Sequence, residues 1–163
     1  MTAQPDVIDT VLGLDRFPDL KALRDERAKL KHLTQTSYEA ARRPAERGNF
    51  SYDERAALAA RMAALWKADE LAAHYNGLLE NADAATRALA DPAENGQGDA
   101  RLAAILAHVD LVTLSPKEAT RGNIEALAAV GLDDRDIVTL AGLIAFVNYQ
   151  VLVVAGLKML RDN

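Results

Sequence analysis

The sequence predicts an all-α protein, and two observations support this fold class. Apolar residues recur at spacings of three and four along almost the whole chain, whereas the period-two alternation that marks a strand never persists. The composition also leans on alanine and leucine, which are strong helix formers. Since 163 residues are the size of one domain, we expect a single helical bundle of about six to eight helices.

Residues 1–48 are expected to form an N-terminal helical region packed on the rest of the chain. A short helix should cover Asp6 to Leu12 and end at Gly13, a residue type suited to a helix C-terminus. Pro18 suits the first position of the next helix, which should run, with or without a break, to about Arg43. The apolar face of that helix would comprise Leu20, Leu23, Leu30 and Leu33. The polar segment RPAERGNF should then form a loop.

Residues 49–163 are expected to form the main helical domain, which opens with a capping box from Ser51 to Glu54. In this motif the serine oxygen and the glutamate carboxylate satisfy each other's free backbone amides at the start of a helix. A second helix should begin near Lys67, and the segment DPAENGQGD should be a surface loop. The predicted core residues of the two helices are Leu58, Met62 and Leu65 on the first and Leu71, Tyr75, Leu78 and Leu79 on the second.

The last third of the chain is expected to add three more helices. The second of them should begin at another capping box, from Ser115 to Glu118, and end at Gly131. The third is capped by Asp133 or Asp134 and runs to about Leu160. The apolar stripe of the first consists of Leu102, Ile105, Leu106 and Val109.

The final helix is apolar nearly all round, which favours central burial or a subunit interface. Asn148, Tyr149 and Gln150 interrupt its apolar run near the middle, so we interpret it as a core or interface helix and expect no membrane span. A buried amide needs hydrogen-bond partners. Asn148 and Gln150 should therefore fix helix packing, with contact to a ligand as the alternative.

Charge and composition exclude several classes of function. A net charge of -5 gives no basic surface for a nucleic-acid partner. The segment MTAQPDVIDT has no basic stretch followed by an apolar one, so we expect no signal peptide and a cytoplasmic location. The absence of cysteine excludes disulfides, thiolate catalysis, zinc–thiolate sites and iron–sulfur clusters. Because His32, His74 and His108 form no metal-binding spacing, we expect neither a metal site nor a cofactor.

Two segments carry the patterns of a known family: FSYDERAALAARMAALWKADELAAHY and LSPKEATRGNIEALAAVGLDDRDIVTLAGLIAFVNYQVLVVAGL. Over about residues 50–160 the chain resembles the alkylhydroperoxidase D-like, or carboxymuconolactone decarboxylase, family. That family combines a capped helix of pattern L-S-x-x-E-x-E-L with a helix of pattern C-x-x-C-x-x-x-H. Its closing pattern, L-x-x-x-D-I-L-x-x-x-x-x-x-x-F-x-N, is matched by Asp136, Ile137, Phe146 and Asn148. The resemblance implies a helical bundle of that family's fold.

The resemblance also implies a thiol relay, and this chain lacks it. In the family one cysteine attacks a peroxide and the second resolves the product, while a glutamate and a histidine move protons. Alignment of the capping boxes places Ala56 at the glutamate, Ala68 and Leu71 at the two cysteines, and Tyr75 at the histidine. Since no thiol is present, a thiol peroxidase is excluded.

The weak candidates for catalysis are His74, Glu54 and Glu70. Glu70 and His74 are four residues apart on one helical turn, which suits an acid–base pair as well as an ordinary surface pair. Glu54 would act as a base, although the capping box already accounts for it. The candidates to line a pocket are Trp66, Tyr75 and Asn148, with packing in the core as the alternative for Tyr75.

We therefore expect a cysteine-free relative of this family that forms a homo-oligomer, as a dimer, trimer or hexamer. It would serve as a scaffold, a partner-binding protein or a small-molecule-binding protein. One alternative is a non-redox enzyme of the lactone decarboxylase or isomerase type that uses His74 with Glu54 or Glu70. Another is a protein that partners a cysteine-bearing paralogue of the family.

Overall fold

The computed structural model describes residues 5–163, and these form nine α-helices and no β-strand. The all-α prediction is confirmed. There are more helices than predicted because the helix after Pro18 is divided in two and a short helix lies before the DPAENGQGD loop. In chain order the elements are α1 (Val7–Leu12), η1 (Leu14–Arg16), α2 (Pro18–Asp25), α3 (Ala28–Arg42), α4 (Tyr52–Leu65), α5 (Asp69–Gly77), α6 (Ala84–Ala88), α7 (Ala100–Leu114), η2 (Pro116–Glu118), α8 (Arg121–Ala129) and α9 (Asp134–Arg161), where η denotes a 3₁₀ helix.

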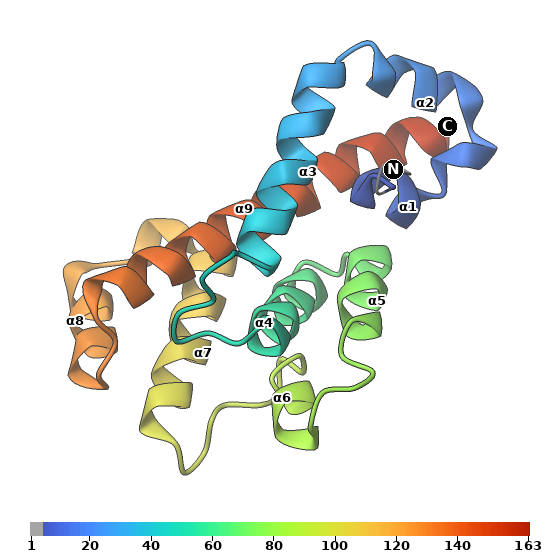
Figure 1. Ribbon diagram of the computed structural model, residues 1–163. Helices are drawn as coiled ribbons and strands as arrows, with labels where there is room; N and C mark the ends of the chain where they lie inside the picture. The colour runs from blue at the N-terminus through green and yellow to red at the C-terminus, as the bar shows by residue number, and fades with distance from the viewer. Residues whose placement is uncertain (1–4) are drawn as a thin grey trace.

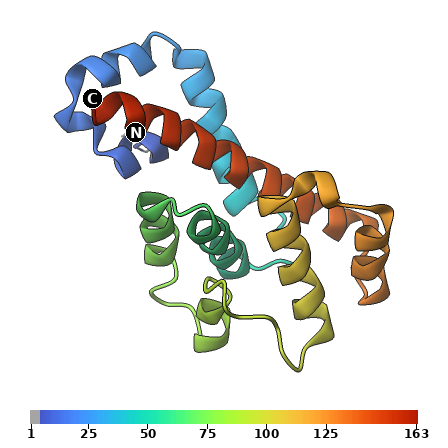
Figure 2. The ribbon, with the colours of Figure 1, turned by 180° about the vertical axis from the view of Figure 1, so that it is seen from behind.

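Helix α9 runs the length of the molecule and contacts α1, α3, α4, α7 and α8 (Figure 1). Figure 2 shows from behind that α1 to α3 gather at its C-terminal half, whereas α7 and α8 lie toward its N-terminal half. Asp133 caps its start by accepting a hydrogen bond from the backbone amide of Asp136. Among the described helices, α9 is long and apolar enough to cross a membrane, and 44% of its most apolar window is buried within the protein.

The N-terminal helices begin and end where the sequence predicts, but of the four leucines expected on the inward face of α2 and α3, Leu20 alone packs against the core. Gly13 ends α1 in the left-handed conformation, with φ of 61°, and Pro18 begins α2. Leu23, Leu30 and Leu33 are 52%, 52% and 50% exposed. The inward face of α3 consists of Thr34 and Tyr38 instead. A spacing of three and four fits an outward apolar face as well as an inward one, which is why this part of the prediction is wrong.

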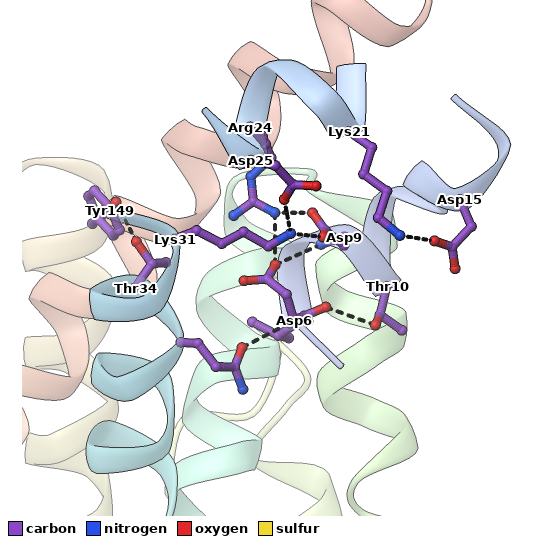
Figure 3. Close-up of polar contacts among 12 residues, drawn as sticks. Asp6, Asp9, Thr10, Asp15, Lys21, Arg24, Asp25, Lys31, Thr34 and Tyr149 are labelled. Atoms are coloured by element: carbon purple, nitrogen blue, oxygen red, sulfur yellow. Dashed lines mark hydrogen bonds and ion pairs between the residues drawn. The ribbon is translucent and has the colours of Figure 1, made fainter. Parts of the chain in front are cut away.

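A partly buried network of charges joins the three N-terminal helices (Figure 3). Its members are Asp6 and Asp9 on or before α1, Arg24 on α2 and Lys31 on α3. Arg24 donates to Asp6 at 2.8 Å and also to Asp9, which in turn accepts from Lys31. The hydroxyls of Thr34 and Tyr149 lie 3.0 Å apart and connect α3 to α9. These polar contacts add to the burial of Val7, Ile8, Leu12 and Leu14 in holding the N-terminal region, whereas the exposed leucines of α2 and α3 contribute little.

Helix α4 lies at the centre, and its side chains from Arg55 to Ala63 are all buried. The predicted capping box starts this helix: Ser51 Oγ accepts from the amide of Glu54 at 3.1 Å, and Glu54 Oε2 accepts from the amide of Ser51 at 2.6 Å. Alanine at most of the buried positions lets neighbouring helices approach closely. Buried Arg61 donates two hydrogen bonds of 2.6 Å to Asp110 on α7, which fixes the two helices together.

The second predicted capping box, from Ser115 to Glu118, does not form. Residues Pro116–Glu118 are a 3₁₀ helix, and α8 begins only at Arg121. The backbone amide of Ser115 donates to Leu111, so this serine ends α7 and is not free to start a new helix. The start of α8 is capped instead by Asn123, whose side-chain oxygen accepts from the backbone amide of Thr120 at 2.7 Å.

Candidate functional site

Helices α4 and α5 and the turn between them carry the four positions that the alignment of the capping boxes equates with the relay. Lys67 adopts a left-handed conformation, with φ of 56°, and this reverses the chain within three residues. Ala56 on α4, and Leu71 and Tyr75 on α5, are buried in the core. Ala68 is partly buried at the start of α5. Packed apolar and aromatic groups therefore occupy the positions that this alignment equates with the reacting side chains of the resembled family.

Tyr75 is held in the interior by a single hydrogen bond. Its hydroxyl donates to Gln150 Oε1 on α9 at 2.5 Å, and both residues are buried. Burial raises the pKa of Tyr75 well above its ordinary value, so the phenol stays neutral. This bond connects α5 to the middle of α9 and leaves the hydroxyl unavailable to a ligand.

His74 lies beside Tyr75 and contacts α3. Its Nε2 atom is 2.8 Å from the hydroxyl of Tyr38, and its ring packs edge-on against Tyr75 at 5.2 Å between ring centroids. Burial, with a smaller contribution from the charge of Arg42, lowers the pKa of His74. The imidazole is therefore neutral at pH 7 and is part of an aromatic cluster, which we define as Tyr38, His74, Tyr75 and Phe146.

The structure does not bring the predicted acid–base residues together. Glu54 is engaged in its capping box. Glu70 pairs with Lys158 on α9 at 2.7 Å, and the hydrogen bond from Lys158 is the main reason why the pKa of Glu70 is lowered. The hydrogen-bond partner of His74 among the described residues is Tyr38. Neither carboxylate forms a hydrogen bond or an ion pair with His74, the histidine that it was expected to assist.

An open pocket of about 480 Å³ lies on the other side of this turn, between the end of α4, the C-terminal part of α7 and the middle of α9. We call it the Trp66 pocket. Trp66 Nε1 donates to Asn148 Oδ1 at 2.6 Å, and Asn148 Nδ2 donates to the backbone oxygen of Ile144 at 3.0 Å. The indole is thus fixed at the rim while part of its surface remains exposed. Other lining residues include Val112, Ala141, Ala145 and Leu152.

Two polar residues of the Trp66 pocket are buried without a hydrogen-bond partner in the described structure. His108 and Thr113, both on α7, are 8% and 2% exposed. His108 Nδ1 and Thr113 Oγ1 make no hydrogen bond, and burial lowers the pKa of His108. Sequence reasoning found Trp66 and Asn148 as pocket candidates but missed these two. The sequence did contain a signal for them: Thr113 is the single polar residue of the apolar run LVTL, and His108 lies on a predominantly apolar helix.

A second hollow, of about 470 Å³, lies between α3, the loop at 43–51 and α9. Three of its charged side chains already have partners: Arg135 pairs with Glu46 at 2.7 Å, and Arg55 donates to the backbone oxygens of Phe50, Ala41 and Arg47. Within residues 5–163, no three His, Asp or Glu side chains gather in a way that suits a metal ion. The Trp66 pocket is therefore the better candidate site.

The fold is similar to that of a known protein, whereas the sequence matches no family. The crystal structure of an uncharacterized peroxidase-related protein from Silicibacter sp. TM1040 superposes with a TM-score of 0.71 and 18% sequence identity, covering 97% of this chain and 86% of that chain. No protein-family model matches the sequence. No curated protein matches it either. At this identity the likeness shows the fold alone.

Proposed function

We propose that this protein is a cysteine-free relative of the alkylhydroperoxidase D-like family that binds a small molecule in the Trp66 pocket. The observation that carries the proposal is the open, uncharged pocket with two buried polar atoms that lack partners. Binding pockets typically combine an apolar lining with a few polar groups that orient the ligand. The peroxidase-related structural neighbour supports the fold of the proposed family but assigns no function.

Two further observations weigh against reaction chemistry at the relay positions. Ala56, Leu71 and Tyr75 are buried there, and the chain has no thiol to attack a peroxide. For a non-redox enzyme, His74 would need a carboxylate in reach, whereas Glu54 and Glu70 are paired elsewhere. Binding without redox chemistry accounts for more of the geometry than either reaction does.

Self-association is a second part of the proposal, because large apolar side chains remain exposed. Besides the leucines of α2 and α3, the exposed set on α9 comprises Val138, Tyr149, Leu152, Met159 and Leu160. Large exposed apolar areas commonly mark interfaces. We expect a homo-oligomer, measured as the native mass by light scattering. Replacement of Leu30 and Leu33 by glutamate should shift it toward the monomer, and a monomeric wild-type protein would contradict this part.

The first experiment is native mass spectrometry of the purified protein, compared with its denatured mass. Added mass at integral stoichiometry per subunit would reveal a retained ligand. Trp66 is the chain's one tryptophan, so a ligand in the pocket should also change its fluorescence. The variant Leu114→Asp, at the pocket rim, should abolish both signals, with Ile124→Asp at an exposed position of α8 as the control. If neither signal exists in wild-type protein screened against a small-molecule library, the proposed function is wrong.

Peroxidase activity is tested separately. With alkyl hydroperoxide and a dithiol reductant, the purified protein should consume no peroxide above the rate without protein. Turnover that persists after trace metal has been removed would contradict the proposal, because it would require a reacting group other than a thiol.

A further inference from the structure

We infer that the ligand of the Trp66 pocket is an uncharged, mainly apolar molecule with at least one hydrogen-bonding group, which is recognised by His108 and Thr113. This inference depends on the proposed function and adds the chemical class of the ligand. It stands on three features of the pocket: the lack of charge in its lining, the unpartnered polar atoms and the apolar character of its remaining wall.

The lining contains no Asp, Glu, Lys or Arg side chain. An ionised group on the ligand would be transferred from water into the pocket and would find no opposite charge there. This transfer is strongly unfavourable in an apolar site. Burial lowers the pKa of His108, so the imidazole is neutral at pH 7 and supplies no cation for a carboxylate, sulfonate or phosphate. The pocket therefore selects against anions and cations alike.

The unpartnered atoms call for a hydrogen-bonding group on the ligand. Buried polar atoms are normally paired, because an unpaired one loses its bond to water and gains nothing in return. Neutral His108 carries one donor and one acceptor nitrogen, and the Thr113 hydroxyl can act in either role. Both atoms are covered by protein in the ligand-free structure, so a carbonyl, hydroxyl or amine group on the ligand would reach one of them after a rotation of the His108 or Thr113 side chain.

Other buried polar residues of the described chain show why these two stand apart. Three further residues have an unpartnered buried atom: Asp6, Arg42 and Gln150. Each of them makes a hydrogen bond through another atom, to Arg24, Glu39 and Tyr75 respectively. His108 and Thr113 have no such bond within residues 5–163, and both line the same pocket.

Apart from the amide of Asn148, which is bonded to Trp66 and Ile144, the rest of the pocket is mainly hydrocarbon. Val112, Ile144 and Leu152 line it together with alanines of α9, and the indole of Trp66 lies at the rim. A volume of about 480 Å³ lies within the usual range for pockets that hold drug-sized organic molecules. Burial of an apolar body against this wall would supply most of the affinity, and the polar atoms would set the orientation.

The test compares two fluorescent probes that share one ring system. N-phenyl-1-naphthylamine is uncharged and has an amine donor, and 1-anilinonaphthalene-8-sulfonate is the same molecule with an added sulfonate. Each is titrated into the full-length protein, with probe emission and energy transfer from Trp66 as readouts. We expect the neutral probe to bind at least about tenfold more tightly than the sulfonate. Equal or tighter binding of the sulfonate would overturn the inference and leave the proposed function standing.

Variants locate the recognition within the pocket. His108→Leu and Thr113→Val should each weaken binding of the neutral probe by about three- to tenfold. Thr34→Val replaces another buried helical threonine outside the pocket and should leave binding unchanged. Unaltered binding by both pocket variants would overturn the assigned roles of His108 and Thr113.

Two other outcomes separate this inference from the function on which it depends. If neither probe binds and native mass spectrometry also finds no ligand, the proposed function fails together with the inference. Protection of Trp66 from acrylamide quenching that grows with protein concentration would place a second copy of the chain over the pocket. That result would overturn the inference in favour of an interface.

Discussion

Two neighbouring regions flank the turn at residues 66–68, and they differ in how their polar groups are satisfied. On the α5 side, the hydroxyl of Tyr75 reaches Gln150 and that of Tyr38 reaches His74, and the aromatic cluster fills the space. On the α4 side, Trp66 borders an open pocket where Thr113 has no partner. On the α5 side each of these residues makes at least one hydrogen bond, although Gln150 Nε2 has no partner, whereas His108 and Thr113 at the pocket make none.

This difference indicates that the Trp66 pocket, and not α5, is the region in which to look for function. The resemblance to a thiol-relay family directs attention to α5, where core packing fills the positions aligned with the relay. The Trp66 pocket lies beside it and uses residues of α7 that the relay pattern does not include. Satisfied polar groups indicate a structural role, whereas unsatisfied buried ones need an explanation.

The largest effect should come from a leucine-to-alanine change in the filled region. Leu71 is 0% exposed, whereas Leu152 at the pocket rim is 59% exposed. Leu71→Ala should lower the free energy of unfolding by about 2–5 kcal/mol, because it leaves a cavity in the core. Leu152→Ala should cost less than about 1 kcal/mol. Urea denaturation measures both, and equal losses would remove the contrast between the two regions.

A change of one hydroxyl should test whether Tyr75 is structural. Tyr75→Phe leaves the buried amide of Gln150 with no hydrogen bond from this side chain, and should cost about 1–3 kcal/mol in urea denaturation. Tyr149→Phe removes a tyrosine hydroxyl that is bonded to Thr34 on the more exposed face of α9 and is the matched control. A Tyr75→Phe protein as stable as wild type would show that the hydroxyl is free for another role.

The pH dependence of stability should carry a contribution from the two buried histidines. Burial lowers the pKa of both His74 and His108. Between that lowered pKa and the unfolded value of about 6.5, the unfolded chain binds more protons, so the free energy of unfolding falls as the pH is lowered through this window. The stabilisation from the neutral histidines is fully present above the unfolded pKa of about 6.5, and it is lost as the pH falls toward the lowered pKa of the folded state.

Thermal unfolding between pH 7.5 and 5 measures this contribution, with the range chosen to bracket the histidine pKa of about 6.5. His74→Gln and His108→Gln should each make the profile flatter than that of wild type. A neutral ligand bound at His108 should steepen the wild-type profile, because it favours the unprotonated imidazole, and should leave the His108→Gln profile unchanged. Profiles that are identical in all three proteins would contradict the role given to burial.

The smallest effect is expected for Thr113→Val. Thr34 is 5% exposed and bonded to Tyr149, whereas Thr113 is equally buried but unbonded. Thr34→Val should therefore cost about 1 kcal/mol, and Thr113→Val in the ligand-free protein should be neutral or stabilising by up to about 0.5 kcal/mol. Differential scanning calorimetry resolves the sign. A loss for Thr113→Val as large as that for Thr34→Val would indicate a hidden structural bond.

Several helix boundaries follow from short local motifs, and these were predictable. The Ser51 capping box, the left-handed Gly13 and the aspartate cap of α9 each depend on neighbouring residues alone. The Ser115 capping box was wrong because α7 extends to Leu114 and uses the same serine as its last hydrogen-bond donor. A motif at the junction of two helices is ambiguous until the length of the first helix is known.

The sequence by itself determined the helical class, the absence of thiol chemistry and most helix ends, because these depend on residue identity and short-range hydrogen bonds. Only the tertiary structure decided that Leu30 and Leu33 face outward, that Tyr75 and Gln150 pair across the core, and that His108 and Thr113 line one pocket. The physical reason is that periodicity states which residues share a face of a helix. Which helix covers that face is fixed by packing between residues far apart in the chain.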